Sequence, residues 1–135
     1  MSRRTAREVA LRALFQVDVG RSSAQRALAY NLASFELSEA DAAFARRLVE
    51  GTLANLDVID PIIHKAAIHW SVERMARTDR NILRMAIYEI LFEPEVPESV
   101  TVNEAVELAK MYGDADSGKF VNGVLGQVVR AKTLE

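Results

Sequence analysis

Two groups of residues combine positive charge with aromatic or amide side chains. One group lies near the N-terminus and the other near the C-terminus: Arg3, Arg4, Arg7 and Phe15, and Lys119, Phe120 and Asn122. Cations attract a phosphate backbone, aromatic rings stack on unpaired bases, and amides form hydrogen bonds with base edges. These residue types indicate single-stranded RNA as a candidate ligand. The alternative is that Phe15 and Phe120 are ordinary core residues.

The charge distribution favours the same ligand. The chain has 135 residues and a net charge of −2, but residues 1–30 carry six arginines against Glu8 and Asp18. This end therefore has a formal charge of +4, which leaves −6 for the other 105 residues. Positive charge at the start of a helix opposes the helix dipole. The arginines thus suggest either an anion-binding end or a simply solvated helix start.

The segment from Gly113 to Lys119 resembles a phosphate-binding loop, but three features argue against that function. Phe120 occupies the place of the hydroxyl residue that should bind magnesium, and the segment follows a predicted helix instead of a strand. Asp114 and Asp116 would also repel a nucleotide's phosphates. The same two aspartates resemble the opening of a calcium loop, yet the glycine comes one place early and the final bidentate glutamate is missing.

The sequence predicts no catalytic site, no cofactor and no metal site. The chain contains no cysteine, and His64 and His69 have no third ligand at metal-binding spacing. Ser117 lacks a plausible general base. Because these catalytic groups are missing, we expect a protein that is not an enzyme. No apolar run approaches the roughly 18 residues of a membrane span, so we expect it to be cytoplasmic.

The apolar spacing predicts an all-α domain. About seven helices are expected, near residues 5–19, 25–35, 38–53, 55–68, 78–92, 101–112 and 117–132. The fifth helix is apolar almost all round and should lie at the centre, with Arg80 and Arg84 on one exposed side. Ser38 should cap the third helix. We expect one domain over residues 1–135, with an N-terminal half (1–68) and a C-terminal half (69–135). Trp70 should anchor the junction between these two halves.

Five segments of the chain resemble the NusB family of transcription antitermination factors. They are residues 6–15, 82–89, the Val96-Pro97 step, 103–110 and 119–125. The resemblance follows the whole chain in order and spacing. It implies an all-helical fold of two packed helical halves with an arginine-rich start.

The resemblance also implies a function and a set of site residues. Family members pair with the small-subunit ribosomal protein NusE, bind the boxA element of nascent ribosomal RNA transcripts, and help the transcription elongation complex read through terminators. The RNA-binding residues would be the two groups named above, with Phe15 at a position that is an aromatic RNA contact in relatives. Asp79 falls where relatives carry an acidic partner-contacting residue, and Arg80 and Arg84 lie on the same predicted helix.

Three other functions remain open from the sequence. The chain could be a protein-interaction module in which the arginine-rich helix forms a homodimer. It could be an accessory RNA-binding domain that serves an RNA methyltransferase on another chain. It could also be a nucleotide-binding enzyme built on Gly113 to Lys119, which a negative nucleotide titration would remove.

Overall fold

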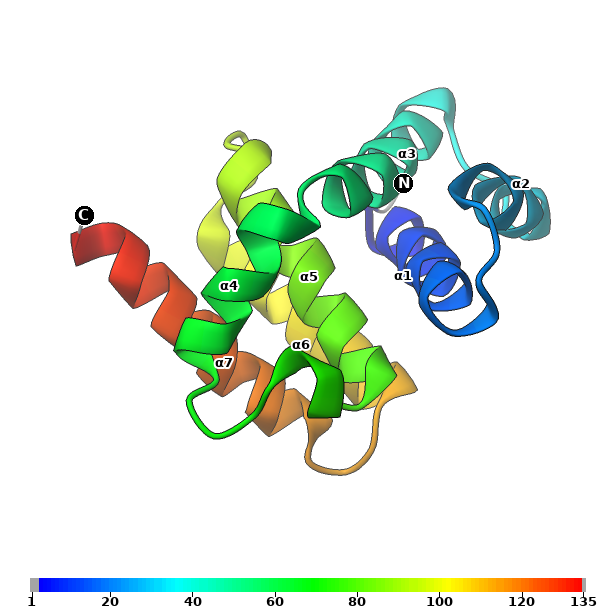
Figure 1. Cartoon of the computed structure of the whole chain (residues 1–135). Helices are drawn as coiled ribbons and strands as arrows, with labels where there is room; N and C mark the ends of the chain where they lie inside the picture. Colours follow the sequence, from blue (N-terminus) through cyan, green and yellow to red (C-terminus); the bar gives the residue numbers. More distant parts are fainter. Residues whose placement is uncertain (1–2, 135) are drawn as a thin grey trace. The chain divides into compact units, whose positions relative to one another are not determined.

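Helices form all the regular structure of the described part of the chain. The computed structural model describes residues 3–134, in which no strand occurs. Seven α-helices and one 3-10 helix follow in the order α1 (Arg3–Gly20), α2 (Ala24–Ser34), α3 (Glu39–Ala54), α4 (Leu56–Ala66), η1 (Val72–Arg74), α5 (Arg77–Phe92), α6 (Glu98–Tyr112) and α7 (Ser117–Leu134). Figure 1 shows this order from blue to red. The prediction of an all-α fold is confirmed.

The chain divides into two compact units, one up to Ala54 and one from Asn55 onward. Helices α1, α2 and α3 pack against one another in the first unit, and α4 to α7 form the second. The division expected between residues 68 and 69 is therefore corrected. Its physical reason is that Ile59 and Ile63 of α4 are fully buried, and α4 packs against α5 and α7.

Trp70 does not lie at the division between the units. It belongs to the second unit, after α4, and 52% of its surface is exposed. Its ring and the ring of Phe120 of α7 form a T-shaped pair, with ring centroids 6.4 Å apart and an interplanar angle of 75°. This contact links the turn before η1 to α7, two segments whose contacting residues are 50 positions apart in the sequence.

The first unit is built on small residues of α1 and large residues of α3. Ala6, Ala10 and Ala13 are fully buried, as are Phe44 and Leu48. Small side chains on one helix let the larger side chains of its neighbour fill the space between them. At the start of α3, the Ser38 hydroxyl accepts a hydrogen bond from the Asp41 backbone N–H at 3.1 Å, which confirms the predicted cap.

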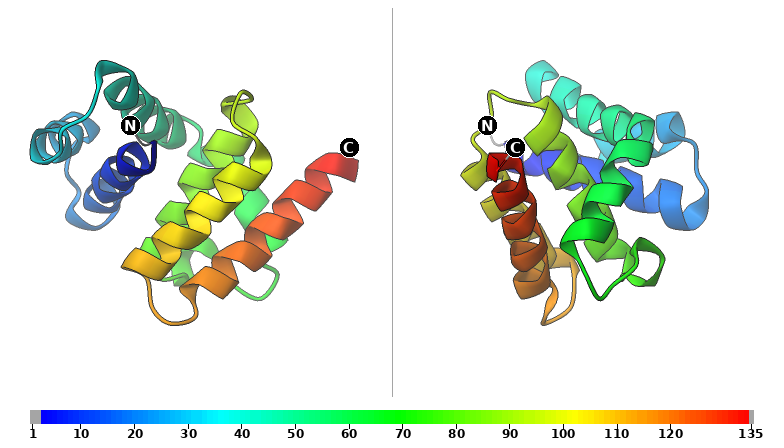
Figure 2. Two further views of the ribbon diagram at one scale, coloured as in Figure 1. Left: turned by 180° about the vertical axis from the view of Figure 1, so that it is seen from behind. Right: turned by 60° about the vertical axis from the view of Figure 1, so that its left-hand side comes forward.

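Helix α5 forms the centre of the second unit. Its residues Ile82, Leu83 and Ile87 are fully buried, and it packs against α4, α6 and α7. The left view of Figure 2 shows α6 in yellow and α7 in orange to red, running side by side and joined by a short turn. The central position predicted from the apolar pattern of this helix is confirmed.

The turn between α6 and α7 is a helix-capping turn. Gly113 ends α6, and a Cβ there would lie 2.8 Å from the Ala109 carbonyl oxygen and closer still to Ser117 Oγ. Ser117 Oγ accepts a hydrogen bond from the Asp114 N–H at 3.0 Å, and the Asp116 N–H donates to Asp114 Oδ1 at 2.9 Å. Side chains thus occupy backbone donors that a phosphate-binding loop would offer to a nucleotide.

Arg80 and Arg84 are not the exposed pair that the sequence suggested. Only 13% of the Arg84 side chain is exposed, and its Nε and Nη2 donate to the two carboxylate oxygens of Asp60 at 2.9 and 2.8 Å. Arg80 Nη1 donates to the Val72 carbonyl at 3.3 Å. Both arginines therefore tie α5 to earlier elements of its own unit. Their partners are distant in the sequence, so helical spacing did not reveal them.

The Arg84–Asp60 pair should contribute to the stability of the second unit. We expect Arg84→Ala to lower the free energy of unfolding by about 1.5–3 kcal/mol, because it leaves a partly buried carboxylate without its bidentate partner. Lys110→Gln removes an exposed pair with Glu107 at 3.5 Å and should change stability by less than about 0.5 kcal/mol. Urea unfolding followed by circular dichroism measures both. Equal effects would contradict the structural role of Arg84.

Candidate nucleic-acid interface

Three arginine guanidinium groups gather around one phenylalanine ring in the first unit. The guanidinium carbons of Arg3, Arg7 and Arg47 lie 4.1, 5.3 and 5.5 Å from the centroid of the Phe44 ring. Attraction between a cation and an aromatic face contributes about 0.5–1 kcal/mol when exposed and about 2 when desolvated. The ring therefore offsets part of the repulsion between these like charges.

The arginines predicted to bind RNA differ in exposure. Arg3 and Arg4 are exposed at the start of α1, whereas Arg7 is only 4% exposed. Arg7 can thus offer little surface to a ligand, and its contact with Phe44 gives it a structural role. Arg47 is an exposed cation at this site that the sequence reasoning missed. Its position three residues after Phe44 on one helix could have signalled the contact.

Phe15 lies on the same side of α1 as Arg4. The two residues are eleven positions apart, which is close to three helical turns and about 16 Å along the axis. The Phe15 ring is 37% exposed, so it is not an ordinary core residue. An exposed cation and an exposed ring on one helical side are the two kinds of contact that a single-stranded nucleic acid uses, one for its backbone and one for its bases.

Lys119 and Asn122 share an open side of α7 in the second unit. Both are exposed, and Gly123 beside them is exposed as well. A Cβ added at Gly123 would meet nothing within 4 Å, so the fold itself does not require glycine there. Glycine weakens a helix interior by about 0.5–1 kcal/mol relative to alanine. This side of α7 therefore offers a cation, an amide and bare backbone together.

Phe120 turns away from Lys119 and Asn122. It is half-buried, and its ring contacts Trp70 beside a cavity that Asp79 also lines. Asp79 is 8% exposed, and burial raises the pKa of its carboxyl above the ordinary value. A hydrogen bond with Ser117 opposes that rise, and the charge of Asp114 adds to it. The structure thus separates Phe120 from the cation and the amide with which the sequence grouped it.

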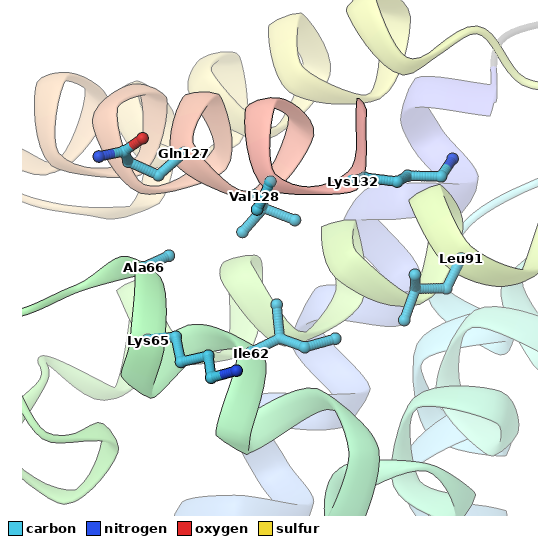
Figure 3. Close-up of a pocket in the computed structure, with 8 residues that line it drawn as sticks. Ile62, Lys65, Ala66, Leu91, Gln127, Val128 and Lys132 are labelled. Carbon is cyan, nitrogen blue, oxygen red and sulfur yellow. The ribbon is translucent and has the colours of Figure 1, made fainter. Parts of the chain in front are cut away.

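A second hollow in the same unit lies between α4, α5 and α7 (Figure 3). Its volume is about 340 Å³, and Ile62, Leu91 and Val128 give it an apolar surface. Lys132 at one end donates to Glu98 Oε2 at 2.6 Å. Among the residues that line it, no nucleophile is paired with a general base.

Neither a metal-binding cluster nor a membrane-spanning helix occurs in residues 3–134. No group of three or more histidine, cysteine, aspartate or glutamate side chains there could hold a metal ion, and this includes His64 and His69. No helix in the same residues is long and apolar enough to cross a membrane.

Curated relatives match this chain over nearly its whole length. The transcription antitermination protein NusB of Heliobacterium modesticaldum is 53% identical over 130 residues, which cover 96% of this chain and 63% of that protein. The protein of the same name from Desulforudis audaxviator is 50% identical over 129 residues, which cover 96% of this chain and 94% of that protein.

A solved structure and a family model agree with these relatives. A crystal structure of the antitermination factors NusB and NusE in complex with double-stranded RNA contains a chain that superposes with a TM-score of 0.87. That chain is 28% identical, and the match covers 96% of each chain. The model of the NusB family matches residues 4–130. The chain described here therefore belongs to the NusB family.

Proposed function

We propose that this protein is an RNA-binding transcription antitermination factor that acts together with NusE. The observation that carries the proposal is the match, over 96% of the chain, to a protein crystallised with NusE and double-stranded RNA. In this proposal the pair binds boxA-type RNA of nascent ribosomal RNA transcripts in the cytoplasm. The complex then joins the transcription elongation complex and helps it read through terminators, and the protein acts by assembly without a chemical step.

The first RNA contact would be the exposed side of α1. Arg3 and Arg4 would neutralise phosphates, and Phe15 would stack on a base about three turns further along the helix. Arg7, which the family resemblance places among the RNA-binding residues, would take a supporting role in this proposal. Because it is buried against Phe44, it would hold Arg3 and the ring in place instead of contacting RNA broadly.

The second RNA contact would be the open side of α7. Lys119 would bind a phosphate, and the Asn122 amide would form hydrogen bonds with a base edge. The bare backbone at Gly123 would let the RNA approach the helix more closely than any side chain permits. Phe120 would support this side of α7 through its contact with Trp70, with only its remaining exposed surface available to a base.

The contact with NusE would centre on Asp79. Arg80 and Arg84 were grouped with it as partner-binding residues, but both are engaged inside the second unit. They would therefore position α5, and with it Asp79, instead of meeting the partner through free guanidinium groups.

Fluorescence anisotropy tests the proposed function directly. A labelled boxA-type RNA and a scrambled RNA of equal length are titrated with this protein, with and without NusE, at two salt concentrations. We expect tighter binding to boxA RNA, a further gain with NusE, and weaker binding at higher salt because counterions are released from the phosphates. A folded protein that binds neither RNA, with or without NusE, would instead favour the protein-interaction module.

Arg4→Ala should weaken binding to both RNAs to a similar extent. A phosphate contact carries no sequence information, so its loss should reduce the slope of log affinity against log salt by about one. Arg26→Ala is the matched control, because Arg26 is an exposed arginine of α2 in the same unit. The placement of the RNA on α1 is wrong if the two variants have the same affinity and salt slope.

Gly123→Ala should change stability and RNA binding in opposite directions. With nothing within 4 Å of the added methyl group, alanine should raise the free energy of unfolding by about 0.5–1 kcal/mol. The same methyl group should weaken RNA binding if the backbone of α7 approaches the ligand. Thermal unfolding and anisotropy measure the two effects, and unchanged RNA affinity in the stabilised variant would remove Gly123 from the interface.

A further inference from the structure

The hollow between α4, α5 and α7 combines an aliphatic floor with positive charge at its edges. Its volume is about 340 Å³, which lies within the range of ligand-binding pockets. Figure 3 shows Ile62 of α4 and Val128 of α7 pointing toward one another across it, with Lys65 on the α4 side and Lys132 on the α7 side. None of the described residues that line the hollow belongs to the proposed contacts with RNA or NusE. The hollow is therefore a separate surface of the second unit.

The floor of the hollow suits aliphatic side chains. It is formed by Ile62, Ala66, Leu91, Val128 and Ala131, and the described lining residues include no aromatic ring and no arginine. Unpaired bases of RNA bind largely by stacking on aromatic rings or guanidinium planes. Aliphatic side chains instead gain about 25 cal/mol for each Å² of apolar surface removed from water. The lining thus favours a protein segment with leucine-like side chains over RNA.

The charges at the rim define the rest of the ligand. The described lining residues include two lysines and no carboxylate. Lys65 is exposed and has no ion-pair or hydrogen-bond partner within residues 3–134, whereas Lys132 donates to Glu98 Oε2 at 2.6 Å. Both lysines lie in the last turn of a helix, where they complement the helix dipole. That structural role leaves the ammonium donors of Lys65 available, so a carboxylate is the complementary group.

The helical backbone around the hollow determines the form of the segment. All the described lining residues belong to α4, α5 or α7, so their backbone N–H groups bond within their own helices. An extended strand would find no free edge to pair with. A helix satisfies its own backbone and can dock through side chains alone. We propose that the hollow binds an amphipathic helix of a protein partner, with leucine-like side chains on the floor and a carboxylate at Lys65.

Fluorescence anisotropy of a labelled synthetic helix tests this docking site. The peptide is about four helical turns long, with leucines at positions i, i+3, i+4 and i+7 and glutamates on both sides of this stripe. The full-length protein is titrated into it at two salt concentrations. A peptide with glutamine in place of each glutamate is the matched control. We expect saturable binding of the acidic peptide that weakens at higher salt, and about fivefold weaker binding of the glutamine peptide.

Two substitutions at exposed positions should remove binding without disturbing the core. Lys65→Glu reverses the charge that faces the peptide, and Ala131→Glu places a carboxylate in the lining of the hollow. Because each change sets like charges against one another, we expect each to weaken binding about tenfold or more. Lys110→Glu should leave binding unchanged, since Lys110 is an exposed lysine of α6 outside the hollow. Circular dichroism confirms that the variants are folded.

Three results in this titration would overturn the inference. They are the absence of saturable binding by the acidic peptide, equal binding of the glutamine peptide, and full affinity in both the Lys65→Glu and the Ala131→Glu variants. An RNA oligomer of equal net charge is then added as a competitor. Displacement of the peptide by this RNA would assign the hollow to RNA and also overturn the inference. Because the titration needs neither NusE nor boxA RNA, its failure is distinct from a failure of boxA binding.

Discussion

The cationic end of the first unit depends on the contact between the Phe44 ring and the arginines around it. Arg3, Arg7 and Arg47 repel one another, and two of them lie near the positive end of the α1 dipole. The negative faces of the ring offset part of this repulsion. The ring comes from α3 and two of the cations come from α1. The basic surface therefore forms only when α1 packs against α3.

Helix α7 separates two kinds of chemistry in the second unit. Lys119 and Asn122 lie on an open side, while Phe120 turns toward Trp70 and the acidic cavity. In the proposed function, the carboxylates beside this cavity would repel a polyanion and favour its approach from the side of Lys119 and Asn122.

Local patterns predicted the features whose causes are local. The all-α class, the Ser38 cap, the end of α6 at Gly113 and the central position of α5 all follow from the spacing and type of neighbouring residues. The family resemblance, based on five segments, is confirmed by the match over residues 4–130. The contacts that were missed join distant residues: Arg84 with Asp60, Trp70 with Phe120, and Arg3 with Phe44. Helical spacing contains no information on such pairs, so Arg84 was expected to be exposed and Trp70 was placed at a junction.

Residues that destabilise the fold without a compensating structural contact are informative about function. Gly113 is explained by its close approach to Ser117, and the partly buried charge of Arg84 is explained by Asp60. The open glycine at position 123 and the partnerless Oδ1 of Asp79 have no such explanation within the described residues. Gly123 lies beside the exposed Lys119 and Asn122 on α7, and Asp79 lies beside Trp70 in the lining of a cavity. RNA bound to the open side of α7, as in the proposed function, would account for a glycine that folding alone would disfavour.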